Sequence, residues 1–283
     1  MTLIAFQGQA HSYSDLACHM AYPGAQTLPC ETFAAAIAAV HDGHADLAML
    51  PPENSIAGRV ADMHALLPES GLSIIGEKFL RVEHCLLAPK GATLKTIKRI
   101  HSHSVALGQV RNLIAELGAT PVTEYDTAGA AEIVARLNNI ADAAIASSLA
   151  GEAHGLQILR RNVEDEAHNT TRFYVLAREP LAVDPAMPDL MTTFVFNVRN
   201  VPAALYKALG GFATNGVNMT KLESYMVNGS FTATQFVAEV DGHPDLPSLM
   251  HAFEELKFFS TEIKILGTYP ADPFRIGLRA AAG

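Results

Sequence analysis

The sequence predicts an α/β protein with two lobes, followed by a separate module of the order β-α-β-β-α-β. Three observations carry this prediction. Short apolar runs alternate with helical patterns through the first 176 residues, polar loops follow the predicted strands, and residues 177–190 have the proline content of a linker. A length of 283 residues is also more than one typical domain needs.

The first lobe begins with a short apolar strand, which predicted helices and a second strand follow. Its expected strands and helices are a strand at 2–6, helices at 14–22 and 32–40, a strand at 45–50 and a helix ending at 63–67. Asp42-Gly43 ends the second helix, and Pro51-Pro52 stops the second strand before a Glu53–Ser55 loop. Strand–helix–strand order with polar loops at strand ends is typical of a mainly parallel sheet.

Two longer extended runs, 73–79 and 82–88, are expected to cross into the second lobe. That lobe is predicted to contain strands at 97–102, 120–125 and 143–146, helices at 107–117, 128–138 and 149–153, and an extended return over 155–176. Two α/β lobes joined by two crossings form a clamshell. Ligands in such folds bind at the carboxyl ends of the strands, between the lobes.

The C-terminal module differs in kind from the clamshell. We expect strands at 191–197, 219–226, 231–240 and 263–269, helices at 202–213 and 246–256, and a turn at 227–230. Pro202 suits the first turn of a helix, and the turn contains an Asn-Gly pair typical of hairpins. This order is ferredoxin-like.

Composition excludes several functions. The net charge of −9 comes without a basic stripe, so nucleic acid is not an expected partner. Cys18, Cys30 and Cys85 form no CxxC pair, and no signal peptide or membrane-length apolar stretch is visible. A cytoplasmic protein is expected. His101 and His103 share a strand face, but a metal site there needs further ligands, and no cofactor motif is present.

Polar clusters fall at several predicted strand ends of the clamshell. They are Gly8–Ser14, Glu53-Asn54-Ser55, Ser102-His103-Ser104 before Gln109, Asp126–Ala131, Ala144–Ser148 and Asn169–Phe173. The first can bind a carboxylate at a helix N-terminus, and Ser12 or Ser14 can equally serve as a helix cap. For two other loops the structural alternative is again helix capping, by Ser55 in one and by Asp126 or Thr127 in the other. Together the loops favour a chemistry that needs positioned donors and no cofactor.

The ordered set of these loops resembles prephenate dehydratase. The resemblance covers Phe6 to about Tyr269, and its specific parts are the Glu53–Ser55 loop and Thr171-Arg172-Phe173. It implies a periplasmic-binding-protein-like catalytic domain followed by an ACT regulatory domain, in which Asn218–Ser224 matches a characteristic run. No chorismate mutase segment precedes the clamshell, so a monofunctional form is expected.

By this resemblance the reaction converts prephenate to phenylpyruvate, carbon dioxide and water. Thr171 is the expected donor to the leaving hydroxyl. Arg172 is expected either to neutralise substrate charge or to set the field around Thr171, and Phe173 to form a wall. Asn54, Ser55, Gln109 and Thr127 are expected to hold substrate oxygens, with Glu53 in the same loop. If a variant lacking the Thr171 hydroxyl kept full activity, the acid role would pass to Glu53 or His103.

The ACT resemblance implies feedback by L-phenylalanine through Ala204, Leu205, Asn218, Glu223 and Ser224, and a homodimer or homotetramer paired at open sheet edges. The sequence departs from the family at three places. His11 and Ala203 stand where relatives commonly carry glycine, and Tyr225-Met226 replaces an Arg-Pro pair, which puts the usual effector geometry in doubt.

Two alternatives stay open from the sequence. A ligand sensor could use the same clamshell without catalysis, and arogenate dehydratase is a close enzyme whose aminated substrate the sequence does not distinguish. The expected boundaries are a catalytic domain at 1–178, with lobes at about 1–78 with 165–178 and at 79–164. A linker at 179–190, an ACT domain at 191–271 and a tail at 272–283 follow.

Overall fold

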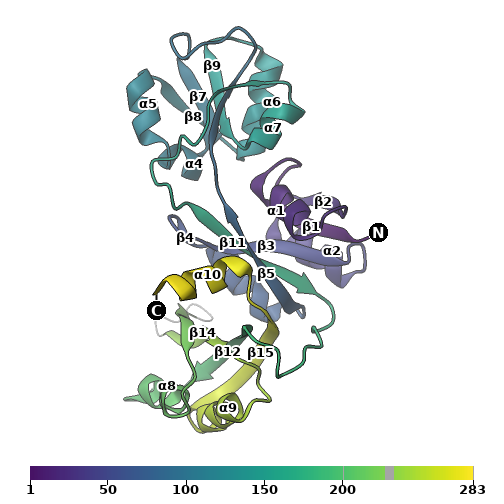
Figure 1. Ribbon diagram of the computed structural model, residues 1–283, viewed down its shortest axis with the longest axis vertical. Helices are drawn as coiled ribbons and strands as arrows, with labels where there is room; N and C mark the ends of the chain where they lie inside the picture. The colour runs from purple at the N-terminus through teal and green to yellow at the C-terminus, as the bar shows by residue number, and fades with distance from the viewer. Residues whose placement is uncertain (200, 227–232, 283) are drawn as a thin grey trace. The chain divides into compact units, whose positions relative to one another are not determined.

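The computed structural model describes residues 1–199, 201–226 and 233–282 and confirms the α/β fold class. Its described part has three sheets (Figure 1). The chain divides into two compact units, residues 1–64 with 78–173 and residues 65–77 with 174–283. The expected turn at 227–230 lies outside the described residues, as do residues 231 and 232 of the expected strand.

The first sheet has the order β2-β1-β3-β11-β5, and β4 pairs with β3. Its strands are β1 (Leu3–Gln7), β2 (Gln26–Cys30), β3 (Leu47–Asn54), β4 (Gly58–Arg59), β5 (Ser73–Arg81) and β11 (Thr170–Ala177). The helices here are α1 (Tyr13–Ala21), α2 (Phe33–His41), α3 (Ala61–Leu66) and the 3-10 turn η1 (Leu67–Glu69). The β1 side chains Ile4 and Phe6 are fully buried, as a central parallel strand requires.

Two features of this sheet differ from the sequence prediction. β3 does not stop at Pro51 but continues to Asn54. A proline lacks an N–H donor but keeps its carbonyl, and the Pro52 carbonyl accepts from the Val60 N–H at 2.8 Å. β4 then pairs Glu53 with Arg59 and Asn54 with Gly58. The short strand β2 was not predicted, because the run that contains Pro29 shows no period-2 pattern.

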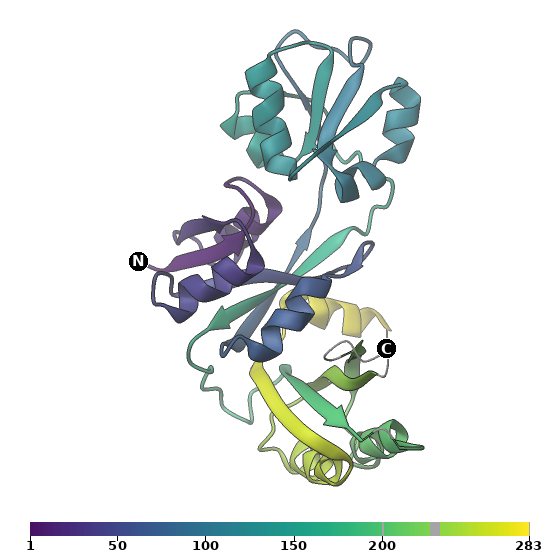
Figure 2. The same cartoon turned by 180° about the vertical axis from the view of Figure 1, so that it is seen from behind.

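The second sheet has the order β10-β6-β9-β7-β8. Its strands are β6 (Cys85–Ala88), β7 (Arg99–His103), β8 (Thr120–Glu124), β9 (Asp142–Ala146) and β10 (Gln157–Arg160). Alternate residues of β9 enter two cores: Ala143 and Ile145 pack with α5, whereas Ala144 and Ala146 pack with α6. The views in Figures 1 and 2 show α5 and α6 on opposite faces of this sheet.

The helix expected over 107–117 is two helices. α4 (Ser104–Gly108) has Gln109 as its C-cap, and α5 (Arg111–Leu117) begins after Val110. Asp165 stabilises the break, because its carboxylate accepts from the N–H groups of Arg111 and Asn112 at 2.9 and 3.2 Å. The other helices of this sheet, α6 (Thr127–Leu137) and α7 (Ser148–Ala153), lie close to their predicted positions.

The third sheet has the order β13-β14-β12-β15 and confirms the β-α-β-β-α-β module. It contains β12 (Leu190–Val198), α8 (Ala204–Thr214), β13 (Met219–Met226), β14 (Ala233–Asp241), α9 (Pro247–Phe259) and β15 (Ser260–Pro270). Both helices cover one face of the sheet (Figure 2). Phe194 of β12 is in contact there with Phe212 of α8 and, edge-on at 4.9 Å, with Phe253 of α9.

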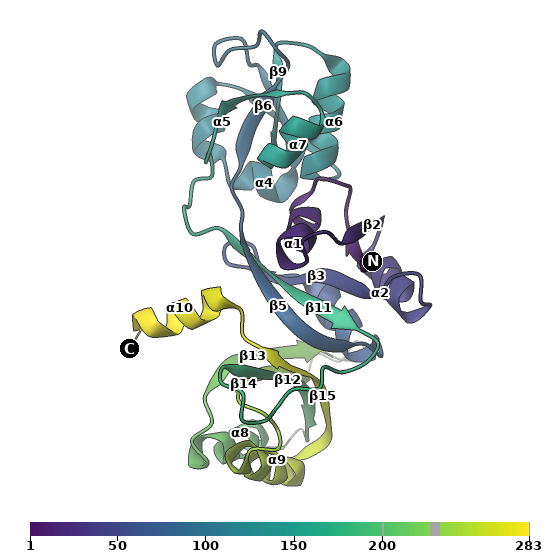
Figure 3. The ribbon, with the colours of Figure 1, turned by 45° about the vertical axis from the view of Figure 1, so that its right-hand side comes forward.

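The expected tail is not a plain extension. It forms the helix α10 (Pro273–Ala282), which follows β15 (Figure 3). Arg275 of this helix binds both carboxylate oxygens of buried Glu77 at 2.8 and 2.9 Å. Buried Glu239 accepts a hydrogen bond from the Tyr174 hydroxyl and lies 3.5 Å from Arg275. These buried charges are therefore paired within the second unit.

Ala203 precedes α8 with a φ of +63°, in the left-handed region that favours glycine. We predict that Ala203→Gly raises the free energy of unfolding by about 1 kcal/mol, because the Cβ clash of that conformation is removed. Urea denaturation measures the change. Ala213→Gly, in the last turn of the same helix, is the control and is expected to lower stability by up to about 1 kcal/mol. Destabilisation by both variants would contradict the strain at residue 203.

Candidate active site

A cavity of about 280 Å³ lies in the first compact unit, where strand ends and helix starts of both lobes meet. Its walls combine small apolar side chains with hydroxyl, carboxamide and imidazole groups. The lining residues are Tyr13, Ser14, Pro51, Asn54, Ala57, Val60, Val82, His84, His103, Val105, Ala106, Gln109, Thr127, Thr171 and Phe173. Five residues from the predicted site are among them: Asn54, Gln109, Thr127, Thr171 and Phe173.

Strand alternation separates the members of the Thr-Arg-Phe motif at the start of β11. Thr171 and Phe173 line the cavity, whereas the Arg172 side chain is buried and is not part of the lining. The Arg172 guanidinium donates to Glu53 Oε1 at 2.9 Å and lies 5.7 Å from the centre of the Phe79 ring. Thr171 therefore presents its hydroxyl to the cavity, while the Arg172 guanidinium holds the end of β3 through Glu53.

Asn54 is the residue of the Glu53–Ser55 loop that reaches the cavity. Its Oδ1 accepts from the N–H groups of Ile56 and Ala57 at 3.0 and 2.8 Å. Its Nδ2 donates to Asn169 Oδ1 at 2.8 Å and to Thr171 Oγ1 at 2.9 Å. The loop amide is thus fixed in orientation, and it donates to the hydroxyl of Thr171.

Ser55 has a different position from the one expected. Its hydroxyl donates to the His168 carbonyl at 2.8 Å and accepts from the Thr170 N–H at 2.9 Å, while its N–H donates to the Thr170 carbonyl. Ser55 therefore fastens the start of β11 to the loop after β3, and neither it nor Glu53 lines the cavity. The expectation that Ser55 holds substrate oxygens does not match this geometry.

Three side chains reach the cavity from the second lobe. Gln109 lies at the break between α4 and α5, where the chain leaves helical geometry and lets the side chain turn inward. Thr127 is the first residue of α6, and Asp126 is the cap, because its Oδ1 accepts from the Gly129 N–H at 2.6 Å. His103 caps α4 through Nδ1 and also lines the wall.

Sequence analysis gave His84 no site role and included Tyr13 only within the Gly8–Ser14 cluster, although both line the cavity. The Tyr13 hydroxyl contacts His84 Nδ1 at 2.9 Å, and His84 Nε2 contacts Gln109 Oε1 at 2.9 Å. Burial lowers the pKa of His84 from its ordinary value of 6.5, against the weaker opposing influences of Gln109 and Glu164, and burial raises the pKa of Tyr13. The signal for His84 in the sequence was a single histidine directly before the apolar run at 85–88.

This pKa shift predicts a pH dependence of stability. The unfolded chain binds a proton on His84 below about pH 6.5, whereas the folded chain resists it. The free energy of unfolding contributed by His84 is therefore fully present above that pH and falls as the solution is acidified toward the depressed pKa. Urea unfolding at pH 7.5 and 5.5 should show a larger loss for the native chain than for His84→Gln. Equal losses would contradict the assignment.

Metal binding at His101 and His103 is not what the geometry favours. His101 Nδ1 lies 2.8 Å from Glu124 Oε1 and Nε2 lies 3.2 Å from Asp142 Oδ1, so both ring nitrogens are engaged by carboxylates. The Arg99 side chain also binds Asp142 and holds the pKa of that carboxyl below its ordinary value. Among the described residues no cluster of three or more His, Cys, Asp or Glu has the geometry to hold a metal ion.

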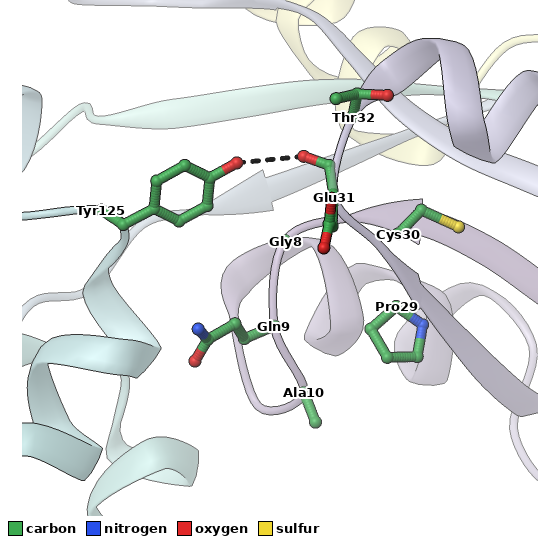
Figure 4. Close-up of a pocket in the computed structure, with 8 residues that line it drawn as sticks. All are labelled: Gly8, Gln9, Ala10, Pro29, Cys30, Glu31, Thr32 and Tyr125. Carbon is green, nitrogen blue, oxygen red and sulfur yellow. Dashed lines mark hydrogen bonds between the residues drawn. The ribbon is translucent and has the colours of Figure 1, made fainter.

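The Gly8–Ser14 loop is divided between two places. Tyr13 and Ser14 line the cavity, and Ser12 caps α1 by accepting from the Asp15 N–H at 3.4 Å. Gly8, Gln9 and Ala10 instead line a second cavity of about 630 Å³, beside which the Tyr125 hydroxyl donates to the Glu31 carbonyl at 3.0 Å (Figure 4). The predicted carboxylate-binding loop is therefore only partly at the first cavity.

His11 does not line either cavity. Its φ of +68° lies in the region that favours glycine, and its N–H donates to Asp15 Oδ2 at 2.7 Å. The ring is edge-on to His154 at 6.2 Å. The side chain that replaces the common glycine at position 11 therefore contributes to neither cavity wall.

In the described part of the chain no helix has the length and apolar character needed to span a membrane.

Comparison with known proteins identifies relatives over nearly the whole chain. The family model described as prephenate dehydratase matches residues 4–181. A protein of Komagataeibacter europaeus, named bifunctional N-acyl-homoserine lactone acylase/prephenate dehydratase, is 62% identical over 96% of this chain and 97% of its own. Arogenate dehydratase/prephenate dehydratase 2 of Arabidopsis thaliana is 37% identical over 95% of this chain and 73% of its own.

A solved structure agrees with these relatives. It is prephenate dehydratase from Arthrobacter aurescens in complex with L-Phe. That protein is 30% identical to this one, the match covers 95% of this chain and 90% of the other, and the TM-score is 0.86. Sequence and structure comparisons thus point to the same family.

Proposed function

Because this chain belongs to the prephenate dehydratase family, we propose that its first cavity converts prephenate to phenylpyruvate. The observation that carries the proposal is the position of Thr171: its hydroxyl lines the cavity and accepts a hydrogen bond from a fixed Asn54 amide. That contact uses an oxygen lone pair of Thr171 and leaves its proton to point toward a bound substrate.

The reaction needs little from the protein besides positioned donors. As the ring carboxylate leaves as carbon dioxide, its bonding electron pair enters the ring and the carbon–hydroxyl bond breaks on the opposite carbon. The departing oxygen gains negative charge, takes a proton and becomes water, and the ring becomes aromatic. Thr171 donates to that oxygen while its charge develops, and solvent later restores any proton that is transferred.

The cavity walls also suit a substrate with two carboxylates. No lysine or arginine is in the lining set, so the groups that the wall offers to an anion are side-chain donors and helix N-termini. The first turn of α1 contributes Tyr13 and Ser14, and α6 contributes its first residue, Thr127. Helix N-termini carry partial positive charge, and two of them border this one cavity.

The remaining predicted residues receive roles from their contacts. Gln109 and Asn54 present carboxamides at the cavity, and buried Phe173 forms part of the wall. Arg172 acts on the site through Glu53, by fixing the end of β3 next to Asn54, and not by pairing with the substrate. A non-catalytic sensor would need neither the Thr171 hydroxyl nor this support.

The direct test of the proposed function is product formation. Purified protein is incubated with prephenate at neutral pH, and phenylpyruvate is followed by its absorbance in alkali. We expect a rate far above the spontaneous reaction, and a rate equal to the spontaneous one would reject the proposal. Competition between prephenate and arogenate in the same vessel then measures which side-chain group, keto or amino, the cavity prefers.

A second candidate function is supported by the relative that is 62% identical across nearly the whole chain, because its name joins an acylase to the dehydratase. Hydrolysis of an N-acyl-homoserine lactone needs a base to activate water and a donor for the leaving amine. His103 is on the cavity wall, and because its Nδ1 accepts from the Val105 N–H, a neutral ring has an Nε2–H to donate to the leaving amine. Val60, Val82 and Val105 offer apolar contact to an acyl chain. These features support the same cavity as the site.

Release of homoserine lactone from an N-acyl-homoserine lactone tests this second activity. We expect prephenate to inhibit the release competitively, because both substrates would occupy one cavity. Release that prephenate leaves unchanged would place the acylase activity elsewhere, and no release above a buffer control would remove the proposal.

The β-α-β-β-α-β module is proposed to be an ACT domain that binds L-phenylalanine and lowers dehydratase activity. Support comes from the solved relative whose complex contains L-Phe. Among the expected effector residues, Asn218 donates to Asp241 at 2.8 Å, Glu223 accepts from Tyr225, and Leu205 packs against the module core. Ala204 is buried at the start of α8, and Ser224 is exposed on β13.

Calorimetric titration with L-phenylalanine tests the effector, and absence of heat over the physiological concentration range would reject it.

β13 is an edge strand of the module sheet, which supports the homodimer or homotetramer expected from the sequence. Light scattering is expected to give one of these two masses, and a monomer would count against edge pairing. The cytoplasmic location remains a prediction from the sequence.

A further inference from the structure

We infer that His84 is a positioning residue, which as a neutral Nε2–H imidazole donates to Gln109 and fixes the orientation of the Gln109 carboxamide at the cavity wall. The inference rests on the proposed function, because the orientation of Gln109 affects turnover only if a substrate binds in this cavity. The hydrogen-bonded chain of side chains runs Tyr13, His84, Gln109, Asn169, Asn54, Thr171, with each adjacent pair at 2.8–3.0 Å.

The direction of the chain is set by two backbone groups. The N–H groups of Ile56 and Ala57 donate to one end of the Asn54 carboxamide, and a backbone N–H cannot act as an acceptor. That end of Asn54 must therefore be the oxygen, and the other end must be the NH₂ group. It follows that the Asn54 NH₂ group donates to Thr171 Oγ1 and to Asn169 Oδ1, its two shortest contacts, and it also lies 3.3 Å from the Thr170 carbonyl oxygen.

The direction then passes unchanged through two further carboxamides. Asn169 must present its oxygen to the Asn54 NH₂, so its own NH₂ faces Gln109, 3.0 Å from Oε1. Asn169 is 1% exposed and Gln109 9%, so a reversed amide would bury facing donors without acceptors. Gln109 Oε1 thus accepts from Asn169 on one side and needs a donor on the other.

His84 supplies that donor. Its Nε2 lies 2.9 Å from Gln109 Oε1, so Nε2 must carry the proton, and Nδ1 of a neutral ring is then an acceptor. The Tyr13 hydroxyl lies 2.9 Å from Nδ1 and is an available donor, shared with the Glu83 carbonyl. The surrounding ionisable groups are Tyr13, Glu83, Cys85 and Glu164, whose carboxylate accepts from the His84 backbone N–H.

This arrangement predicts more than a packing role. With Oε1 fixed by two donors, the NH₂ group of Gln109 is not used by these contacts and can face substrate oxygens. At the other end, Asn54 occupies a lone pair of Thr171 and directs the proton into the cavity. Removal of the His84 donor leaves Gln109 Oε1 with Asn169 as its donor and releases the Gln109 carboxamide to rotate, whereas Asn54 stays fixed by Ile56 and Ala57.

Three substitutions at one position test the inference. Gln places a side-chain NH₂ near the Nε2 position, Asn places it near the Nδ1 position, and Leu fills similar space without a donor. On prephenate, His84→Leu and His84→Asn are expected to lower kcat about tenfold with a smaller change in KM, and His84→Gln to keep most of it. Equal kcat for the Gln and Asn variants, at matched unfolding free energies, would overturn the inference.

A second measurement does not depend on activity. Proton–nitrogen correlation spectra of histidine-labelled protein report the protonation and tautomer of each ring, and the His84 signal is identified by its loss in His84→Gln. We expect a neutral ring with the proton on Nε2 at neutral pH. An Nδ1–H tautomer or an imidazolium would overturn the inference. If the native chain lacks dehydratase activity while the expected tautomer is present, the proposed function fails and the hydrogen-bond direction stands.

Discussion

Gly267→Ala is expected to destabilise the second compact unit by about 3 kcal/mol or more. A Cβ built on Gly267 of β15 would lie 2.0 Å from the Ile74 carbonyl oxygen of β5 and 2.8 Å from the carbonyl carbon. Both obstacles are backbone atoms, which cannot be moved by a rotamer change. The strand must then separate from β5 or lose its register with β12, where Gly267 pairs with Thr193.

Equilibrium urea denaturation of the full chain measures this effect. Gly210→Ala is the matched control, because Gly210 lies in α8 of the same module and a Cβ there meets nothing within 4 Å. That variant is expected to be neutral or stabilising by up to about 1 kcal/mol, since alanine favours helix. If Gly267→Ala unfolds at the same urea concentration as the native chain, the close contact of β15 with β5 is wrong.

The fold could be predicted from the sequence wherever the pattern of side chains is local. Alternation of apolar runs gave the order of strands and helices, and capping and turn residues gave most boundaries. Long-range pairing was not accessible in the same way. Pro51 and Pro52 indicated a strand end, yet β3 continues because Val60 donates to the Pro52 carbonyl and β4 pairs beyond it. α10 likewise depends on Glu77, far away in sequence.

The candidate site could likewise be predicted where the pattern is local, but not where it depends on contacts between distant residues. The loops that reach the cavity were predictable, because they follow strands and carry clusters of polar residues. The roles of neighbouring residues were not. One step along β11 reverses the face, so Arg172 lies beside cavity residues and does not line the cavity. Ser55 follows β3 in a turn, and its hydroxyl is used by the backbone of His168 and Thr170. Tyr13 and His84 were missed because their contacts with each other and with Gln109 exist only in the folded chain.

Thr171→Val is expected to lower kcat on prephenate about 100-fold or more while KM changes little. Valine has the shape of threonine but no hydroxyl, so the packing of the cavity wall is kept and the donor to the departing oxygen is lost. Asn54 Nδ2 would also lose one acceptor, which adds a modest loss of stability. Thr171→Ser is the control, because it keeps the hydroxyl, and we expect it to stay within about tenfold of the native kcat.

Thr170 offers a second comparison on the same strand. Its backbone is held by Ser55, and its side chain is not part of the cavity lining. Thr170→Val is therefore expected to leave kcat almost unchanged. A large loss at residue 170 and none at 171 would mean that the strand presents the opposite face to the substrate.

The measurement that tests the central claim most directly is the kcat of Thr171→Val for phenylpyruvate formation, at saturating prephenate, beside the native chain. A Thr171 hydroxyl that is aimed by Asn54 and donates to the leaving oxygen predicts a loss of about 100-fold or more with the fold intact. A kcat within twofold of the native value would contradict that role and move the donor to another group on the cavity wall.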